Sequence, residues 1–131
     1  MIVVDASALL EVLLHTPAAE RVGDRLFVAD ETLHAPHVLD LEIAQVLRRY
    51  ARAREIDAAR GAQALEDLAL LPLHRYAHDM FLARIWELRQ NLTAYDAAYV
   101  ALAEGLDAPL VTRDAALATA PGHDARVEVI R

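Results

Sequence analysis

Short apolar stretches alternate with longer amphipathic stretches along this chain. Residues 1–4 are continuously apolar and mostly β-branched, which is typical of a buried strand. Residues 38–54 instead repeat their apolar side chains at helical spacing. With Pro, Gly and capping residues as boundaries, the pattern predicts strands at 1–4, 32–35, 71–74, 109–112 and 126–130, and helices at 8–14, 17–26, 38–54, 57–70, 77–89, 94–104 and 114–118.

This alternation predicts an α/β fold. Short apolar strands separated by helices form parallel sheets that are covered on both faces. The length of 131 residues suits one domain spanning 1–131. Ligands of such sheets bind beyond the carboxyl ends of the strands. Asp5 and Asp114 each follow a predicted strand, so they should share that edge if their strands are parallel neighbours.

Composition excludes several classes of protein. A hydrophobic fraction of 56% is ample for a core and too high for a disordered chain. The absence of cysteine excludes disulfides, thiolate zinc sites and cysteine nucleophiles. The chain reaches a charge at Asp5, too early for a signal peptide, and no stretch is long enough to span a membrane. We therefore expect a soluble, cytoplasmic protein with no membrane partner.

The net charge of −7 argues against nucleic acid as a partner, because phosphate neutralisation normally requires a basic surface. Cations bound in an acidic site would offset part of that charge. All 13 basic residues are Arg, the better bidentate ligand for phosphate, although a GC-rich coding bias explains the same count.

Four acids lie where a predicted strand or helix starts or stops: Asp5, Glu42, Asp96 and Asp114. If they converge, their repulsion is on the order of 4 kcal/mol for a pair 4 Å apart at an effective dielectric constant of 20. A hard divalent cation is the usual way to make such a cluster tolerable. The central question is therefore whether these four side chains meet.

Asp5 and Glu42 each have a structural alternative. Asp5 could cap a helix or occupy a turn, but Ser7 already suits the cap of the helix that follows. Glu42 could be a solvated glutamate that is stabilised by the helix dipole, with Asp40 as the helix cap.

Asp96 and Asp114 could also be capping residues. Thr93 and Asp96 have capping-box spacing, which predicts a bond from Asp96 back to the backbone of Thr93. Asp114 could cap the short helix that it begins, and one residue can be both a cap and a metal ligand. Thr112 and Ser7 place hydroxyls near the two strand ends, where they could bind the carboxylates or act as caps.

Other chemistry has little support. The other acids on the helices, Glu11 among them, have the spacing of solvated faces. The six histidines show no HExxH or paired ligand spacing, and there is no P-loop, GxGxxG or GxSxG motif.

Taken together, the acidic segments resemble the PIN-domain ribonucleases, and most closely the VapC toxins of toxin–antitoxin pairs. Each segment alone is weak, but their order and spacing are specific, above all Tyr-Asp-Ala-Ala-Tyr at 95–99. The segments that carry the resemblance are 2–8, 40–49, 92–103 and 110–114, and none departs from the family at an acidic position.

The resemblance implies a three-layer α/β/α fold with a central, mostly parallel sheet and an acidic pocket that holds Mg²⁺ or Mn²⁺. Asp5, Asp96 and Asp114 would be metal ligands, and Glu42 would bind a second metal or orient the attacking water. Ser7 and Thr112 would support these groups from behind. Candidate phosphate contacts are Arg48, Arg49, Arg52, Arg54 and Arg113, although the first four also suit a solvated helix end.

The leading hypothesis is thus a metal-dependent endoribonuclease toxin that acts on RNA, is neutralised by a small antitoxin and forms a homodimer. Two alternatives stay open: a housekeeping PIN nuclease in RNA processing, and a non-catalytic cation-binding regulatory domain. Acids at strand ends also occur in receiver domains and in phosphatase-like folds. Receiver domains need a lysine, which this chain lacks, and the phosphatase-like pattern needs Asp at the position that Ser7 occupies here.

One apolar helix face has two interpretations. The face formed by Leu9, Leu10, Leu13 and Leu14 could be core or part of an antitoxin groove.

Overall fold

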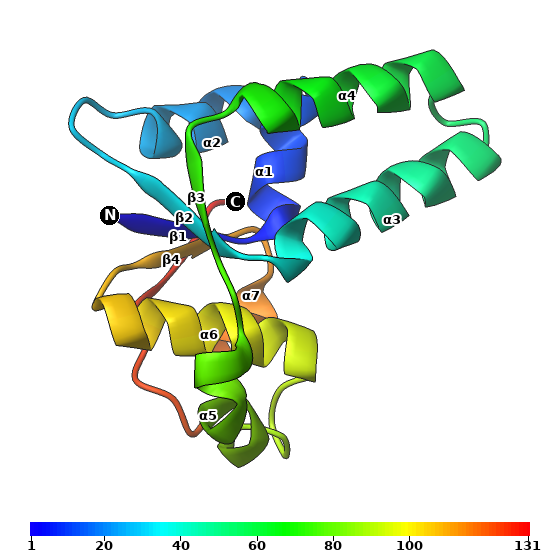
Figure 1. The fold of residues 1–131 in the computed structure, drawn as a ribbon. Coiled ribbons are helices and arrows are strands. Elements are labelled where there is room, and N and C mark those ends of the chain that lie inside the picture. Colours follow the sequence, from blue (N-terminus) through cyan, green and yellow to red (C-terminus); the bar gives the residue numbers. More distant parts are fainter.

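A five-stranded parallel sheet forms the centre of the computed structural model, which describes residues 1–131 (Figure 1). The strand order is β3-β2-β1-β4-β5, and every neighbouring pair is parallel. The strands are β1 (Ile2–Val4), β2 (Leu33–Pro36), β3 (Leu73–Tyr76), β4 (Leu110–Thr112) and β5 (Val127–Val129). The predicted parallel α/β sheet is therefore confirmed.

Helices cover both faces of this sheet and complete three layers (Figure 1). The helices on one side are α1 (Ala6–Leu13), α2 (Ala19–Leu26), α3 (Val38–Arg52) and α4 (Ala58–Leu70). The elements on the other side are η1 (Asp79–Phe81), α5 (Leu82–Glu87) and α6 (Ala94–Leu106). The short α7 (Ala115–Thr119) follows β4.

The core lies between the sheet and these helices. Ile2, Val3 and Val4 of β1 are fully buried, as their continuous apolar pattern predicts. Leu9, Leu10 and Leu13 belong to the same cluster of 27 buried residues, and Leu14 packs against it. This apolar face of α1 is therefore core, which leaves little of it for a partner. None of the helices combines the length and the apolarity that crossing a membrane requires.

Several predicted boundaries are wrong. The strand predicted at 71–74 starts two residues later, because Pro72 has no N–H to donate to a sheet ladder. The helix predicted at 77–89 is the 3-10 turn η1 followed by the six-residue α5, since the chain first crosses from β3 to the opposite face of the sheet. The first helix starts at Ala6, earlier than the pattern predicts, and directly after Asp5.

Candidate active site

The carboxyl ends of β1 and β4 lie side by side and set the position of the site. Val4 pairs with Val111 in parallel register, so Asp5 and Asp114 emerge at the same edge of the sheet. Glu42 comes from α3, which follows β2, and Asp96 lies in the first turn of α6. Topology alone predicts the first pair, and the structure adds the other two.

The four predicted acids line one open pocket of about 460 Å³. Apolar groups from α1 and α3 form part of its wall. Its lining residues are Asp5, Ala6, Ser7, Leu10, Glu11, Glu42, Val46, Arg49, Tyr50, Asp96, Arg113 and Asp114. The expected convergence of the four acidic segments is therefore present in the fold.

Two hydroxyls hold the buried carboxylate of Asp5. Ser7 Oγ lies 2.6 Å from Asp5 Oδ2, and Thr112 Oγ1 lies 2.7 Å from the same oxygen. Each hydroxyl also accepts a backbone N–H, from Arg113 onto Ser7 at 3.0 Å and from Asp114 onto Thr112 at 2.9 Å. The two hydroxyls are thus polarised in one direction, from backbone amides toward Asp5.

These hydrogen bonds also determine where the hydroxyl protons of Ser7 and Thr112 point. Each hydroxyl has one proton, and Asp5 Oδ2 receives both. The 3.2 Å approach of Ser7 Oγ to Thr112 Oγ1 is then a contact without a shared proton. Asp5 Oδ1 accepts no hydrogen bond from the protein and stays available to the pocket. The prediction that Ser7 caps the first helix is wrong, because Asp5 holds the N-cap position and the Ser7 hydroxyl serves the carboxylate.

Glu42 is half-buried and has one partner. The hydroxyl of Tyr99, which is fully buried in α6, donates to Glu42 Oε1 at 2.6 Å. Burial raises the pKa of the Glu42 carboxyl; the Tyr99 hydrogen bond opposes that rise, and the negative charges of Asp5 and Asp96 add to it. Burial and the bond to Glu42 also raise the pKa of Tyr99, which stays a neutral donor. The interpretation of Glu42 as a freely solvated glutamate is therefore wrong.

Asp40 does not cap this helix either. Helix α3 begins after His37, and Asp40 instead forms a bidentate ion pair with Arg75 of β3, with distances of 2.7 and 3.0 Å. Sequence spacing cannot show a partner that is thirty-five residues away.

Asp96 and Asp114 differ in how far capping explains them. Thr93 caps α6 by accepting the N–H of Asp96 at 3.1 Å, but the return bond from the Thr93 N–H to the Asp96 carboxylate is absent. The capping box is therefore half formed. Burial and the charges of Asp5 and Asp114 raise the pKa of Asp96. Asp114 does cap α7, since its Oδ1 accepts the N–H of Ala116 at 2.9 Å, which leaves Oδ2 for the pocket.

Glu11 is a fifth carboxylate in the pocket, although its spacing in the sequence predicts a solvated face. It is only partly exposed, accepts a hydrogen bond from the Thr16 hydroxyl and lies 3.6 Å from the guanidinium of Arg113. The signal that could have found it is its position four residues after Ser7, which puts both on one face of α1.

The arginines predicted to contact phosphate separate into two groups. Arg49 and Arg113 line the acidic pocket, and Arg113 is also anchored to the carbonyl of Ile130 at 3.3 Å. Arg48, Arg52 and Arg54 are exposed and lie outside the pocket. The two pocket arginines are the only cationic side chains beside its five carboxylates.

The donor chemistry of the pocket suits Mg²⁺ or Mn²⁺, both of which prefer oxygen ligands. Asp5 Oδ1, Glu42 Oε2 and Asp114 Oδ2 accept no hydrogen bond from the protein. The acids are not a preformed cage, however, because no three carboxylate or imidazole groups stand close enough together to hold an ion as they are. Binding an ion would require these side chains to turn toward a common point.

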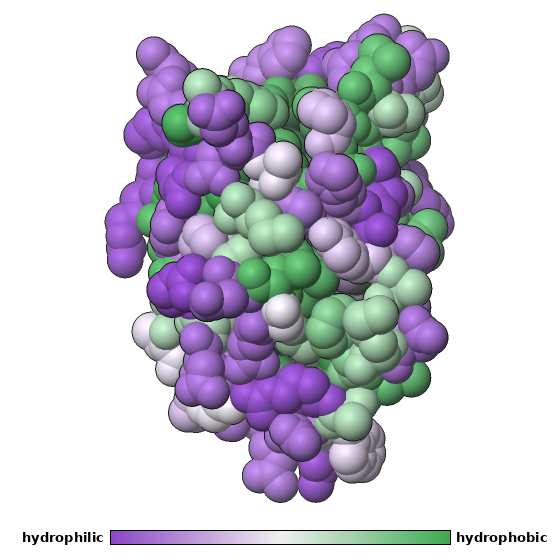
Figure 2. All heavy atoms as spheres, turned by 60° about the vertical axis from the view of Figure 1, so that its left-hand side comes forward, coloured by the Kyte–Doolittle hydropathy of each residue, from purple (hydrophilic) through white to green (hydrophobic).

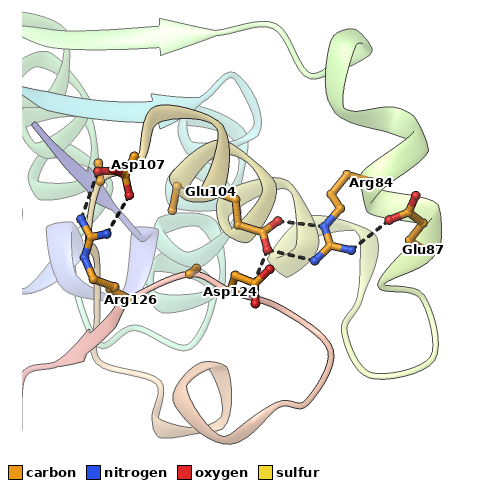
Figure 3. A pocket seen from close by; sticks show the side chains of 9 residues that line it. Arg84, Glu87, Glu104, Asp107, Asp124 and Arg126 are labelled. Atoms are coloured by element: carbon orange, nitrogen blue, oxygen red, sulfur yellow. Dashed lines mark hydrogen bonds and ion pairs between the residues drawn. The ribbon is translucent and has the colours of Figure 1, made fainter.

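A second polar pocket, of about 490 Å³, lies at the other end of α6, and both of its arginines are held in ion pairs (Figure 3). There Arg84 of α5 forms a bidentate pair with Glu104 of α6, at 2.8 and 2.9 Å, and Arg126 pairs with Asp107 at 2.8 Å. Its basic groups are thus paired with its acids, and it fastens α5 and the segment before β5 to α6.

Comparison with known proteins shows the family to which the chain belongs. The PIN domain family model matches residues 2–122, and the chain belongs to the PIN-domain family. Ribonuclease VapC9 of Mycobacterium tuberculosis is 50% identical over 114 residues, which cover 87% of this chain and 86% of that protein. Ribonuclease VapC12 of the same species is 41% identical over 130 residues, which cover 99% of both chains. The resemblance to VapC ribonucleases is confirmed.

Solved structures show the same fold. VapBC2 from Rickettsia felis, bound to a DNA fragment from its promoter, matches with a TM-score of 0.72 at 15% identity and covers 100% of both chains. A toxin–antitoxin complex from Klebsiella pneumoniae matches with a TM-score of 0.70 at 17% identity, covering 100% of this chain and 98% of that one. The three-layer fold expected from the resemblance is therefore confirmed.

Proposed function

We propose that this protein is a metal-dependent endoribonuclease and the toxin of a type II toxin–antitoxin pair. The observation that carries the proposal is the meeting of Asp5, Glu42, Asp96 and Asp114 in one open pocket beside two arginines. A pocket rich in carboxylates repels a phosphodiester unless cations are present, and the named VapC relatives are ribonucleases. An acidic protein can in this way still act on RNA.

The cofactor of this proposal is Mg²⁺ or Mn²⁺. When bound, such an ion neutralises phosphate charge, lowers the pKa of water and stabilises the leaving oxygen. Asp5, Asp96 and Asp114 would hold it, and Glu42 would hold a second ion or orient the attacking water. Ser7 and Thr112 keep Asp5 in place with Oδ1 free. No histidine base is needed, which agrees with a pocket that contains none.

Arg49 and Arg113 would bind the RNA backbone at the mouth of the pocket. We expect Arg49→Gln to weaken RNA binding about tenfold or more, since a charge-assisted contact to phosphate contributes on the order of 1.5–3 kcal/mol. Arg48→Gln is the matched control, because it removes the same charge from the neighbouring exposed position outside the pocket. Fluorescence anisotropy with labelled RNA measures both, and equal losses would exclude a specific role for Arg49.

Two protein partners complete the proposal: a small antitoxin and a second copy of this chain. Several large hydrophobic side chains stay exposed near the site, among them Leu41 of α3 at 73%, Leu82 of α5 at 54% and Tyr95 of α6 at 61%. Leu41 and Leu82 line two adjacent hollows that Tyr95 shares. Figure 2, which brings the left-hand side of Figure 1 forward, shows that hydrophobic residues also form a band across that face of the molecule. Sedimentation of the purified protein measures whether it is dimeric.

The direct test combines cleavage and toxicity. Purified protein with Mn²⁺ should cut RNA, and brief expression should arrest growth and produce mapped cleavage sites. Asp5→Asn should abolish both effects, whereas Asp24→Asn, at an exposed acid outside the pocket, should abolish neither. Co-expression of the short reading frame next to the gene should restore growth.

Each failure has a distinct meaning. If wild-type protein with Mn²⁺ cuts no RNA and Asp5→Asn is as toxic as wild type, the nuclease proposal fails. Cleavage without toxicity would instead favour a housekeeping nuclease in RNA processing. Mn²⁺ binding without cleavage of any RNA would favour a regulatory cation-binding domain.

A further inference from the structure

Tyr99 makes a polar contact that the proposed chemistry does not use. It is the largest fully buried side chain of the molecule, and its hydroxyl crosses from α6 to Glu42 Oε1 of α3 at 2.6 Å. Glu42 Oε2 accepts no hydrogen bond from the protein. One oxygen of this carboxylate is therefore held by the fold and the other remains free.

Glu42 depends on such a hydrogen bond more than the three aspartates of the pocket do. A glutamate has three rotatable side-chain bonds, and its neighbour Leu41 is 73% exposed, so this turn of α3 borders solvent. An unheld carboxylate here could turn out into water and leave the pocket. Tyr99 is rigid by comparison, since it has two side-chain torsions and is enclosed by the core.

The position of Tyr99 on α6 links two of the four acids. Tyr99 lies three residues after Asp96, so both occupy the same face of the helix. The first two turns of α6 thus supply one carboxylate directly and hold a second through the phenol. A displacement of α6 would move both groups together.

We propose that Tyr99 is a positioning residue that holds Glu42 in the acidic pocket and so sets the pocket's affinity for a divalent cation. The inference rests on the proposed metal-dependent function but adds a residue that touches neither the cation nor RNA. Removing a group that hydrogen-bonds to a metal ligand and orients it typically weakens metal affinity about 10- to 100-fold.

Tyr99→Phe tests this proposal because it deletes one oxygen and keeps the ring that fills the core. We expect Mn²⁺ binding, measured by calorimetry and by electron paramagnetic resonance without RNA, to weaken about 10- to 100-fold. Tyr95→Phe is the matched control, since Tyr95 is one helical turn away, 61% exposed and without a hydroxyl hydrogen bond. It should bind Mn²⁺ as wild type does, and thermal unfolding should show that both variants fold.

A double-mutant cycle separates positioning from packing. If Tyr99 acts through Glu42, then Tyr99→Phe should weaken Mn²⁺ binding no further in a Glu42→Ala background. Equal Mn²⁺ affinity of wild type and Tyr99→Phe, or full additivity of the two substitutions, would overturn the inference and leave the proposed function standing. Wild-type protein that binds no Mn²⁺ would overturn both.

Discussion

At the scale of single residues, Thr112 connects the folded backbone to the acidic pocket. It is fully buried at the end of β4, and its hydroxyl accepts the Asp114 N–H and donates to Asp5. A buried polar group that loses its partner costs about 1–3 kcal/mol. The same hydroxyl therefore stabilises the fold and fixes the carboxylate that is most firmly placed in the site.

Thr112→Val keeps the shape of this side chain and removes its hydroxyl. We expect the free energy of unfolding to fall by about 1–3 kcal/mol, because the Asp114 N–H loses its acceptor and Asp5 loses one of two donors. Urea unfolding measures this change. Thr119→Val is the control, since the exposed Thr119 hydroxyl makes only a 3.4 Å contact within its own helix. Equal effects of the two substitutions would contradict a special role for Thr112.

The sequence predicts the acids of the site better than their partners. Asp5 is recognisable because it ends a buried strand, and parallel topology brings Asp114 beside it. The role of Tyr99 is invisible in the sequence, where an aromatic residue on a helix looks like ordinary core. Glu11 was missed for the opposite reason, because an acid on an amphipathic helix looks solvated. The contact of Tyr99 with Glu42 becomes visible only when α3 and α6 are brought together, whereas the spacing of Glu11 from Ser7 is a local signal of its place in the pocket.

At the scale of secondary structure, two histidines connect β2 to the edge strand β3. His34 and His74 are register partners, and their rings stack at 4.8 Å with an interplanar angle of 15°. The ring nitrogens of His34 also bond to the hydroxyls of Thr32 and Tyr76, each at 2.7 Å. Burial, followed by the charge of His74, lowers the pKa of His34. The folded protein thus prefers His34 neutral.

This preference makes part of the stability sensitive to pH. Because the folded-state pKa of His34 lies below that of the unfolded chain, its contribution is present above about pH 6.5 and is lost as pH falls. We expect His34→Gln to reduce the loss of unfolding free energy between pH 7.5 and 5.5, measured by urea unfolding. His37→Gln, at an exposed position, should leave that loss unchanged. A wild-type pH dependence in His34→Gln would refute the prediction.

The elements follow from the sequence more readily than their ends. Apolar runs and helical periods predict all five strands and most helices, because these patterns reflect which faces are buried. The path after β3 could not be predicted, since it depends on where the sheet edge lies relative to α6. The local helix and strand propensities of these residues do not depend on how far the sheet edge lies from α6.

At the scale of the whole molecule, part of the net charge of −7 lies in one partly buried pocket. Five carboxylates share one pocket with two arginines. Partial burial, followed by the charge of neighbouring acids, raises the pKa of both Glu42 and Asp96. These two groups therefore favour the folded state when protonated, and their contribution to stability is lost as pH rises through their folded-state pKa.

Mn²⁺ binding should offset the repulsion between the carboxylates of the pocket, and it should do so more strongly at higher pH. An ion binds the ionised carboxylates, and the raised pKa of Glu42 and Asp96 lets protons compete with it at higher pH than for ordinary acids. We expect the increase in Tm on adding Mn²⁺ to be larger at pH 7.5 than at pH 5.5, measured by scanning calorimetry at each pH with and without the ion. Comparing Tm with and without Mn²⁺ at the same pH removes the separate effect of His34 on stability, which has the opposite pH dependence. An increase that is equal at both values would show that the ion binds elsewhere.

The hydrogen bonds of Asp5 also bear on how a complex with RNA could be trapped for structural work. An inactive variant is normally used to obtain such a complex. Asp5→Asn is a poor choice for it, because this substitution would disturb hydrogen bonds that join β1, α1 and the end of β4. Asp96, in contrast, keeps its polar contacts within the first turn of its own helix. Asp96→Asn should therefore prevent RNA cleavage while preserving the shape of the pocket. This variant is the better starting point for co-crystallisation with an uncut RNA strand.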